Sequence, residues 1–382
     1  MAKVVLIKCD SYDYSSVKKA VGRGLELLGG CRVWVAEGEK ILLKPNLLSA
    51  QPPEKCVTTH PAVFRAVAEA LLEAGAVVTY GDSPALGNPE RVARKAGIMA
   101  VAEELGLELA DFRQGRDVDF PHGSQNKKFT IANGVLASDG LVSLPKLKTH
   151  GLMTITGAVK NQFGCIPGPL KGEFHLRLPQ PEDFARMLVD LTRLLSPRLF
   201  VMDAVIAMEG NGPQNGRPKK LGFILMSTDA VALDATACRL IGLNPGQVLT
   251  VKYGQEFGLG SYHEGDLEII GDSRQDLVVR DFDAAKTRTA LAGRGSRYLR
   301  NAVVPRPTIA EKVCTRCGTC IQMCPVKPPA VDWTDPDKQA TPAYQYDRCI
   351  RCYCCQEVCP EGAITLYTPF LGRLLHRTSL PS

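Results

Sequence analysis

The sequence lacks any apolar run long enough to cross a bilayer. No stretch approaches the roughly 18 consecutive apolar residues that indicate a membrane-spanning helix, so we expect no transmembrane segment. The first ten residues, MAKVVLIKCD, become charged too soon for a secretory signal and are expected to open the fold as a strand. These two absences predict a cytoplasmic protein.

Motifs that bind nucleotides or nucleic acids are also missing. Gly22 and Gly24 fall in a helical pattern and match neither a Walker loop nor a dinucleotide-binding loop. The formal net charge is +6, but the chain has no dense stripe of Lys and Arg with interleaved aromatic residues. We therefore expect no nucleic-acid partner. The sequence gives no indication of the oligomeric state.

Cysteine, by contrast, is abundant, with 14 among 382 residues. Two runs near the C-terminal end share the spacing C-x2-C-x2-C-x3-C-P, which resembles that of bacterial two-cluster ferredoxins. In this spacing the first three thiolates bind one cubane and the fourth reaches the other. The pattern predicts one [4Fe–4S] cluster on Cys314, Cys317, Cys320 and Cys359, and a second on Cys349, Cys352, Cys355 and Cys324.

Two other uses of these cysteines fit the pattern less well. Zinc sites pair two C-x2-C knuckles and need no third cysteine followed by C-x3-C-P, and disulfide frameworks belong to short secreted chains. Cys354 lies between two predicted ligands, fits no ligand position and is expected to be a packed or spare thiol. Exposed clusters also indicate an anaerobic or low-oxygen host. Two loaded cubanes, each with a charge of about −2, would lower the net charge of the protein to about +2.

Apolar periodicity predicts alternating strands and helices through the first 270 or so residues. We expect strands over 4–8, 41–46, 76–82, 140–145, 199–204 and 222–227, and helices over 15–28, 61–73, 183–195 and 229–241. Such alternation is typical of an α/β domain with a mostly parallel sheet. The predicted organisation is an α/β domain over 1–275, a linker over 276–304, a small α+β two-cluster ferredoxin domain over 305–370 and a tail over 371–382.

Polar residues follow several of these strands, at the sheet edge where open α/β folds bind ligands. Lys44 and Asn46 close the second strand, and Asp82 follows the third. The next strand leads into a loop that runs from Pro145 to Gly151 and contains Lys146, Lys148 and His150. Polar strand-end loops are common in any fold, so composition leaves a site and ordinary loops as equal alternatives.

Residues 41–241 resemble the domain of unknown function 362 family. The resemblance is carried by ILLKPN, TTHP, EAGA, YGDSP, LPKLKTHGLMTITGAVKNQFG, MEGNGPQNG and STDAVALDATAC. Members of that family often carry a C-terminal pair of [4Fe–4S] motifs, and their reaction is not generally established. The order of KPN, TTHP and Gly-Asp also resembles, as a fold analogy only, the N-terminal domain of lactate racemase-type proteins.

Each candidate residue has a functional and a structural interpretation. Lys44, Lys146, Lys148 and Lys160 could bind an anion or be surface lysines. Lys146, His150 and Asp82 are the catalytic candidates, with His150 and Asp82 managing protons, although His150 could equally be structural and Asp82 could instead bind a hydroxyl, a metal or a lysine. The predicted ligand-binding residues are Lys44, Asn46, Lys148, Asn161, Gly210 and Gly212.

Several other residues receive a structural interpretation from the sequence. His60 precedes Pro61 at the predicted start of a helix, where Thr59 or His60 lies near the cap, and a structural role is favoured for His60. Gly210 and Gly212 suit a loop whose N–H groups approach an anion. Cys165 could be a redox centre or nucleophile, but a buried thiol fits better because no base lies beside it. The isolated Cys9, Cys31, Cys56 and Cys238 are expected to pack in the core.

Three functional hypotheses follow. In the first, low-potential electrons pass through the two clusters to a small anionic substrate or a partner cofactor at the α/β domain, as in an oxidoreductase or reductive activator. In the second, the chain is a non-catalytic electron carrier that docks on a partner redox enzyme. In the third, the clusters are structural, which is unusual for cubanes in ferredoxin spacing.

Overall fold

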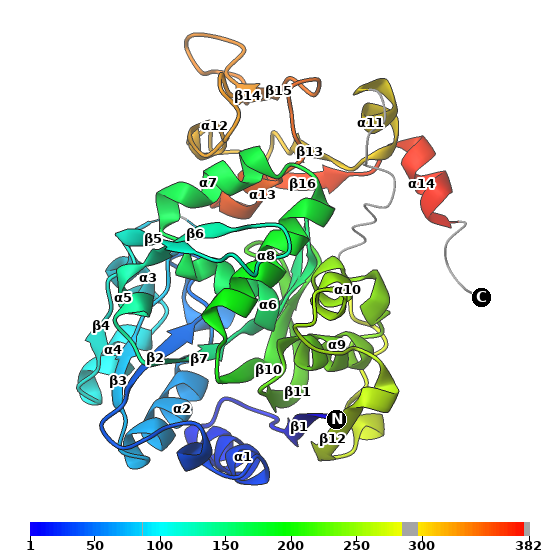
Figure 1. Ribbon diagram of the computed structural model, residues 1–382. Coiled ribbons are helices and arrows are strands. Elements are labelled where there is room, and N and C mark those ends of the chain that lie inside the picture. The colour runs from blue at the N-terminus through cyan, green and yellow to red at the C-terminus, as the bar shows by residue number, and fades with distance from the viewer. Residues whose placement is uncertain (86, 285–296, 378–382) are drawn as a thin grey trace.

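A ten-stranded sheet forms the centre of the computed structural model, which describes residues 1–85, 87–284 and 297–377 (Figure 1). Every strand pair in it is parallel except β1–β11, β10–β11 and β8–β9. The expected mostly parallel α/β fold is confirmed. Across the sheet the strands are β12 (Leu267–Gly271), β1 (Ala2–Lys8), β11 (Arg217–Ser227), β10 (Leu199–Glu209), β7 (Gly140–Leu144), β2 (Lys40–Pro45), β3 (Val77–Tyr80) and β4 (Glu108–Leu109), with β8 (Lys146–His150) beside β10 and β9 (Thr154–Thr156) beside β8.

Helices cover both faces of this sheet, and each face has its own apolar core. Strand β1 shows why: Val4 and Leu6 face one core while Val5 and Ile7 face the other, as the two-residue repeat of a strand requires. One core packs against α1 (Tyr14–Leu27), α2 (Pro61–Glu73), α3 (Pro89–Lys95) and α4 (Ile98–Glu104). The other packs against α6 (Ala158–Asn161), α8 (Pro181–Leu195), α9 (Ala230–Leu240) and α10 (Leu249–Glu256).

Smaller elements complete the α/β domain. A hairpin of β5 (Gly115–Asp119) and β6 (Lys128–Ala132), with α5 (Asn133–Leu136) and α7 (Gly168–Arg177), lies toward the edge that carries the C-terminal part of the chain (Figure 1). Short 3-10 turns lie at η1 (Cys31–Val33), η2 (Pro53–Lys55), η3 (Gln162–Cys165), η4 (Pro245–Gln247), η5 (Glu264–Asp266) and η6 (Arg274–Leu277). Within the described ranges, no helix is both long and apolar enough to span a membrane.

Two expectations about strand ends were wrong. Residues 146–150, predicted as a loop, form strand β8, and the strand predicted over 199–204 continues to Glu209. Here β10 pairs with β11 from Phe200↔Ser227 to Glu209↔Arg217, past a register shift between Ala204 and Ile206. Strand β8 and the end of β10 carry charged residues that lie in a buried site. In the sequence, this polar composition resembles that of a loop.

The last part of the chain folds around the cysteine runs, and we call residues 305–370 the cluster module. It contains β13 (Arg306–Ile309), α12 (Thr319–Gln322), β14 (Val331–Asp332), β15 (Ala343–Tyr344), α13 (Cys354–Val358) and β16 (Ile364–Tyr367). Strands β13 and β16 pair, as do β14 and β15. Helix α11 (Arg297–Val303) lies in the predicted linker, whose residues 285–296 fall outside the described ranges. The predicted tail begins inside α14 (Phe370–Arg377), and its residues 378–382 also fall outside them.

The cluster module docks on the loop that joins β10 to β11. Gln356 donates its amide hydrogens to Asn211 Oδ1, at 2.8 Å, and to the Gly212 carbonyl, at 3.0 Å. Asn215 donates in return to the Cys359 carbonyl, at 3.0 Å. Polar side chains thus satisfy backbone carbonyls on both sides of the contact, which fixes α13 against the end of the sheet.

Tyr353 adds an apolar anchor to this docking. Its backbone has a φ of 61°, in the left-handed region that favours glycine, and the matching position of the first cysteine run is indeed Gly318, with a φ of 74°. The Tyr353 ring is buried in the core of the α/β domain, and its hydroxyl donates to the Pro305 carbonyl at 2.9 Å. A strained backbone therefore persists where the side chain ties two parts of the chain together.

Replacing Asn215 with Ala should weaken this docking. We expect a loss of about 1 kcal/mol, because the Cys359 carbonyl loses the nearer of its two donors and keeps only the Gln214 amide, at 3.4 Å. The measurement is the temperature at which the visible absorbance of the reconstituted clusters bleaches, compared with the global unfolding temperature. Asn88→Ala is the matched control, since Asn88 caps α3 and makes no contact with the cluster module. Equal bleaching temperatures for the two variants would contradict the docking role.

Candidate functional site

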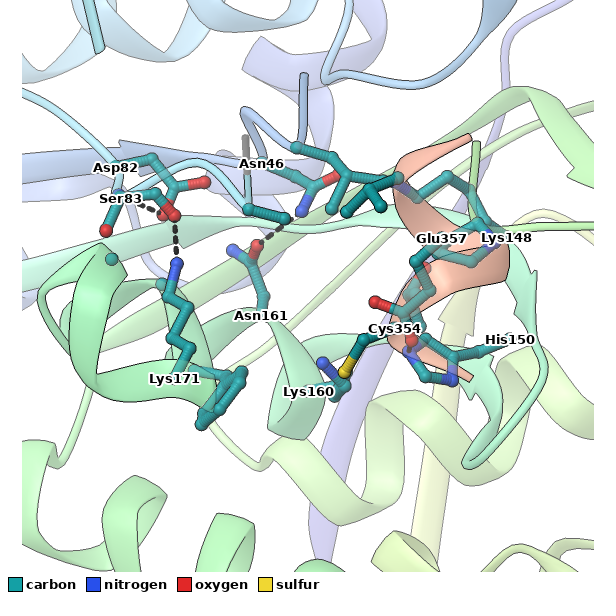
Figure 2. A pocket seen from close by; sticks show the side chains of 18 of the residues that line it. Asn46, Asp82, Ser83, Lys148, His150, Lys160, Asn161, Lys171, Cys354 and Glu357 are labelled. Carbon is teal, nitrogen blue, oxygen red and sulfur yellow. Dashed lines mark hydrogen bonds and ion pairs between the residues drawn. The ribbon is translucent and has the colours of Figure 1, made fainter. Parts of the chain in front are cut away.

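A cavity of about 880 Å³, counted to its open mouth, lies between the α/β domain and the cluster module, and we call it the interdomain pocket. It sits at the carboxyl ends of β2, β3 and β7, where ligands bind in open α/β sheets. Figure 2 shows its side chains converging from both parts of the chain. Six predicted site residues line it: Asn46, Asp82, Lys146, Lys148, His150 and Asn161.

Lys44 and Asp82 form a buried ion pair at the floor of this pocket. Their Nζ and Oδ1 atoms lie 2.9 Å apart, and the side chains are 0% and 4% exposed. Asp82 also accepts hydrogen bonds from the N–H groups of Leu47, at 2.6 Å, and Ser83, at 2.9 Å. Gly164 allows the close approach, since a β-carbon there would clash with the Asp82 carboxylate. These contacts show Asp82 binding a lysine, which is one of the alternatives considered for it, and its role in proton transfer stays a prediction.

Two asparagines connect the lysines of the floor. Asn46 Oδ1 accepts from Lys148 Nζ at 2.8 Å, and Asn46 Nδ2 donates to Asn161 Oδ1 at 3.3 Å. Asn161 also accepts from Lys44 at 3.3 Å and donates to Ser143 at 2.9 Å. The partners of Lys148 are neutral, and burial, with help from Lys146 and Lys160, lowers the pKa of Lys148 to about 7.

Lys146 lines the pocket, but its ammonium is bound by residues that lie outside the pocket lining. Its ammonium donates to Asp203 Oδ2 at 2.8 Å and to the Tyr12 hydroxyl at 2.6 Å. Asp203 also accepts from the Tyr12 hydroxyl, at 2.7 Å, and from the His60 N–H, at 2.9 Å. His60 caps α2 through Nδ1, which accepts from Ala62 N–H at 3.2 Å, in line with the structural role expected for it. The geometry therefore makes Lys146 part of the support of β8 against β10.

His150 joins the two parts of the chain. Its Nδ1 accepts hydrogen bonds from the N–H groups of Leu152, at 3.0 Å, and Met153, at 3.1 Å, so the neutral ring carries its proton on Nε2. Nε2 lies 3.0 Å from Glu357 Oε1 on helix α13. Burial lowers the pKa of His150. Burial would raise the pKa of Glu357, but His150 and Lys160 outweigh it and the pKa falls to about 2.

The pocket also contains residues that the sequence did not lead us to choose as site residues. Lys171 on α7 donates to the Ser83 carbonyl, and burial lowers its pKa to about 7. His175 is 5% exposed and stacks on Phe184 with ring centroids 4.4 Å apart. Glu357 lies between two predicted cluster ligands, in a segment where the cysteine spacing was the only signal recognised in the sequence. Helix α7 has no motif or clear apolar stripe that could have indicated Lys171 or His175.

The structure gives Gly210 and Gly212 a different use from the one predicted. Gly210 has a φ of 76°, and its N–H donates to the Asp283 carbonyl at 2.8 Å. The Gly212 N–H donates to the Gly210 carbonyl at 2.9 Å and to Thr149 Oγ1 at 3.2 Å. Both N–H groups thus have protein partners, and neither glycine lines the interdomain pocket. They shape the loop that receives the cluster module.

The predicted cluster ligands surround two small cavities. Each cavity contains one predicted set of four: Cys314, Cys317, Cys320 and Cys359 line the first, and Cys324, Cys349, Cys352 and Cys355 line the second. In each run, therefore, the fourth cysteine lies with the first three of the other run. Among the described residues, no three His, Cys, Asp or Glu side chains converge as they would on a single metal ion. Cubane thiolates differ in this respect, because each binds a different iron.

The surroundings of these sulfurs suit a cluster. The Ala330 N–H donates to Cys324 Sγ at 3.3 Å, and the Tyr344 hydroxyl donates to Cys355 Sγ at 3.2 Å. Burial and the negative charge of Cys314, Cys317 and Cys359 raise the pKa of Cys320 to about 11. Crowded thiolates of this kind repel one another until cations lie between them, which is the charge that irons supply.

The remaining cysteines have different surroundings. Cys165 is buried beside Leu42 and Phe112, and burial raises its pKa to about 12, which suits the packed thiol that we expected. Cys9, Cys56 and Cys238 are also buried, and Cys31 is partly exposed. Cys354 lines the interdomain pocket next to the cluster ligand Cys355, so it is more than a packing residue.

The sequence matches the family named Domain of unknown function (DUF362) over residues 41–239, which is more than half of the chain. The chain belongs to this family. Residues 313–363 match a 4Fe-4S dicluster domain. A thylakoid-associated protein of Synechocystis is 34% identical over 260 residues, which cover 67% of this chain and 79% of that protein.

Other similarities are more limited. One polypeptide of the H(2):CoB-CoM heterodisulfide,ferredoxin reductase of Methanothermobacter marburgensis is 37% identical over 68 residues, 15% of this DUF362 protein and 10% of that polypeptide. A crystal structure from Thermotoga maritima shares 12% identity at a TM-score of 0.36, covering 59% and 57% of the two chains. The lactate racemase apoprotein of Thermoanaerobacterium thermosaccharolyticum shares 13% sequence identity at a TM-score of 0.37, and the match covers 60% of this chain and 55% of that chain. The dicluster domain and the reductase similarity support an iron–sulfur electron-transfer role.

Replacing Asp203 with Ala should destabilise the protein by about 3–5 kcal/mol, because the buried Lys146 ammonium loses its counter-ion. Chemical denaturation followed by circular dichroism measures the loss. Asp281→Ala is the control: Asp281 pairs with Lys219 at 2.6 Å, but its side chain is 78% exposed, so we expect little change. Similar stabilities for the two variants would contradict the support that we assign to Lys146 and Asp203.

Proposed function

We propose that this protein passes electrons through two [4Fe–4S] clusters to a small anionic molecule in the interdomain pocket. The observation that carries the proposal is the composition of the pocket wall. Lysines of the α/β domain, two of them buried and two partly exposed, form one side, and Met323, Cys354, Glu357 and Val358 of the cluster module form the other. A bound molecule would touch both the cation-rich site and the segments that hold the cluster ligands.

The charge of the pocket favours an anion. Lys148, Lys160 and Lys171 line it, and none of them pairs with a carboxylate among the residues that the structure describes. Lys148 is bound by an amide and a carbonyl, and Lys171 by a carbonyl, so their positive charges are not compensated. Burial strengthens the attraction of these ammonium groups for an anion because little water screens them.

The position of the second cysteine set favours electron transfer into this pocket. Met323 precedes the predicted ligand Cys324, and Cys354 precedes the predicted ligand Cys355. A cluster bound by these cysteines would therefore lie behind the pocket wall. The clusters would supply electrons one at a time, while the protein's own residues bind the anion and hold protons beside it.

The first cysteine set supports a redox partner protein. Cys317 is exposed, whereas the other three cysteines of that set are partly or fully buried. A cluster there would reach the surface, where a donor protein could contact it. The same exposure also suits the alternative function, a non-catalytic electron carrier that docks on a redox enzyme. The cytoplasmic location and anaerobic host stay predictions, and the similar Synechocystis protein is named for its association with thylakoids.

Iron analysis tests the clusters. Protein purified without oxygen should contain about eight irons and as many acid-labile sulfides, and dithionite should produce the EPR signals of reduced cubanes. Cys317→Ser should lower the iron content by about half, because one cubane loses a ligand. Cys354→Ser is the control and should keep the full content. A value near four irons in the unaltered protein, or full iron in Cys317→Ser, would contradict the two-cluster assignment.

The pH dependence of anion binding tests the lysines. The pKa of both Lys148 and Lys171 is lowered to about 7 by burial, so these groups are charged below that pH and lose their charge as pH rises through it. Acetate stays ionised throughout, so its affinity should fall several-fold from about pH 6 to about pH 8.5. Calorimetry on the cluster-loaded protein measures this change, and Lys171→Met should flatten it. An affinity independent of pH would contradict the role of these lysines.

A further inference from the structure

Lys160 differs from the other lysines of the interdomain pocket. It lies on α6, and its ammonium stands over the Phe163 ring at 4.7 Å and over the Phe184 ring at 5.9 Å from the centroids. Within the described part of the chain, no oxygen lies within hydrogen-bond or ion-pair reach of it. Lys148 and Lys171, by contrast, each donate to protein oxygens. Lys160 thus offers its donors to whatever occupies the pocket.

The charges near Lys160 come from both parts of the chain. Burial lowers the pKa of the Lys160 ammonium, whereas the carboxylates of Glu357 on α13 and Asp82 of the α/β domain act in the opposite direction. Glu357 is already engaged by His150 at 3.0 Å. Figure 2 shows Lys160 in the part of the pocket where Cys354 and Glu357 enter from α13. An anion bound by Lys160 would consequently lie against the helix that carries predicted ligands of the second cluster.

The other residues of the pocket wall indicate the chemical character of the rest of such a ligand. Apolar side chains from both parts of the chain contribute to it, namely Leu48, Ala85, Phe163, Pro213, Met323 and Val358. Among the described residues, no arginine lines the pocket, so it lacks the forked donors that suit phosphate. Asp82 and Glu357 also line it and would repel a ligand of high negative charge. These features favour a single carboxylate on an apolar body.

We propose that Lys160 anchors the carboxylate of a small monocarboxylate ligand whose apolar body lies between Phe163 and helix α13. The inference deepens the proposed function, on which it rests, by naming the anchor and the class of ligand. The two rings beneath Lys160 hold its ammonium in place without neutralising it. Met323 and Val358 give the ligand body an apolar contact on the cluster module.

Benzoate is a suitable probe because it combines one carboxylate with a flat apolar body. Isothermal titration calorimetry on the cluster-loaded protein should detect benzoate, with weaker binding of acetate and none of the neutral benzamide. Lys160→Met should weaken benzoate by at least about tenfold, because a charge-assisted hydrogen bond is lost. Lys160→Arg, which keeps the charge, should retain most of the affinity. Iron content and circular dichroism should be unchanged in both variants.

The matched control is Lys252→Met. Lys252 is exposed and stands over the Tyr253 ring at 5.5 Å, so it repeats the lysine–aromatic contact outside the pocket. Its replacement should leave benzoate affinity unchanged. Equal affinity of Lys160→Met and unaltered protein would overturn the anchor while leaving the anion pocket intact. If benzamide binds as tightly as benzoate, the proposed recognition of a carboxylate is overturned. If neither benzoate nor acetate binds, the proposed function of the pocket fails together with this inference.

Discussion

The docking of helix α13 against the end of the central sheet is the constraint on which the interdomain pocket depends. This five-residue helix carries a predicted cluster ligand, Cys355, and three residues of the pocket wall, Cys354, Glu357 and Val358. Polar contacts to the β10–β11 loop and the pair between His150 and Glu357 hold it in place. Because one short element serves both sites, the position of the clusters and the shape of the pocket cannot change independently.

The chemistry of the pocket follows from how its lysines are held. Lys44 and Lys146 each have a buried carboxylate partner, so these two ammonium groups are neutralised and serve mainly to support the floor. Lys148 is held by an amide and a carbonyl, and neutral partners fix its position without cancelling its charge. Hydrogen bonding to neutral groups thus positions the Lys148 ammonium without a counter-ion, and its pKa of about 7 makes its charge depend on pH near neutrality.

The two cysteine sets are unequal in their surroundings, and this gives the proposed electron path a direction. One set reaches the surface at Cys317, and the other lies behind the wall of the pocket. Hydrogen bonds to Cys324 and Cys355 and their burial would tune the second cluster separately from the first. In the proposed function, a cluster bound by Cys355 would also hold α13, three residues of which line the pocket.

The sequence by itself determined the α/β class, most helix and strand positions and membership in a family with a dicluster domain, since each of these rests on local periodicity or fixed spacing. The strand-end rule also selected Asn46, Asp82, Lys146, Lys148 and His150, which line one pocket. Only the tertiary structure decided the roles of these residues. From the sequence Asp82 could manage protons or bind a lysine, and the structure pairs it with Lys44. Gly210 and Gly212 were predicted to form an anion-binding loop, but they shape the loop that receives the cluster module. Lys171 and Glu357 could not be chosen in advance, because their partners, Ser83 and His150, lie more than 80 residues away in the sequence. Spacing along the chain identifies candidate side chains, whereas the free donors and charges that make a site are known only after those distant segments have packed together.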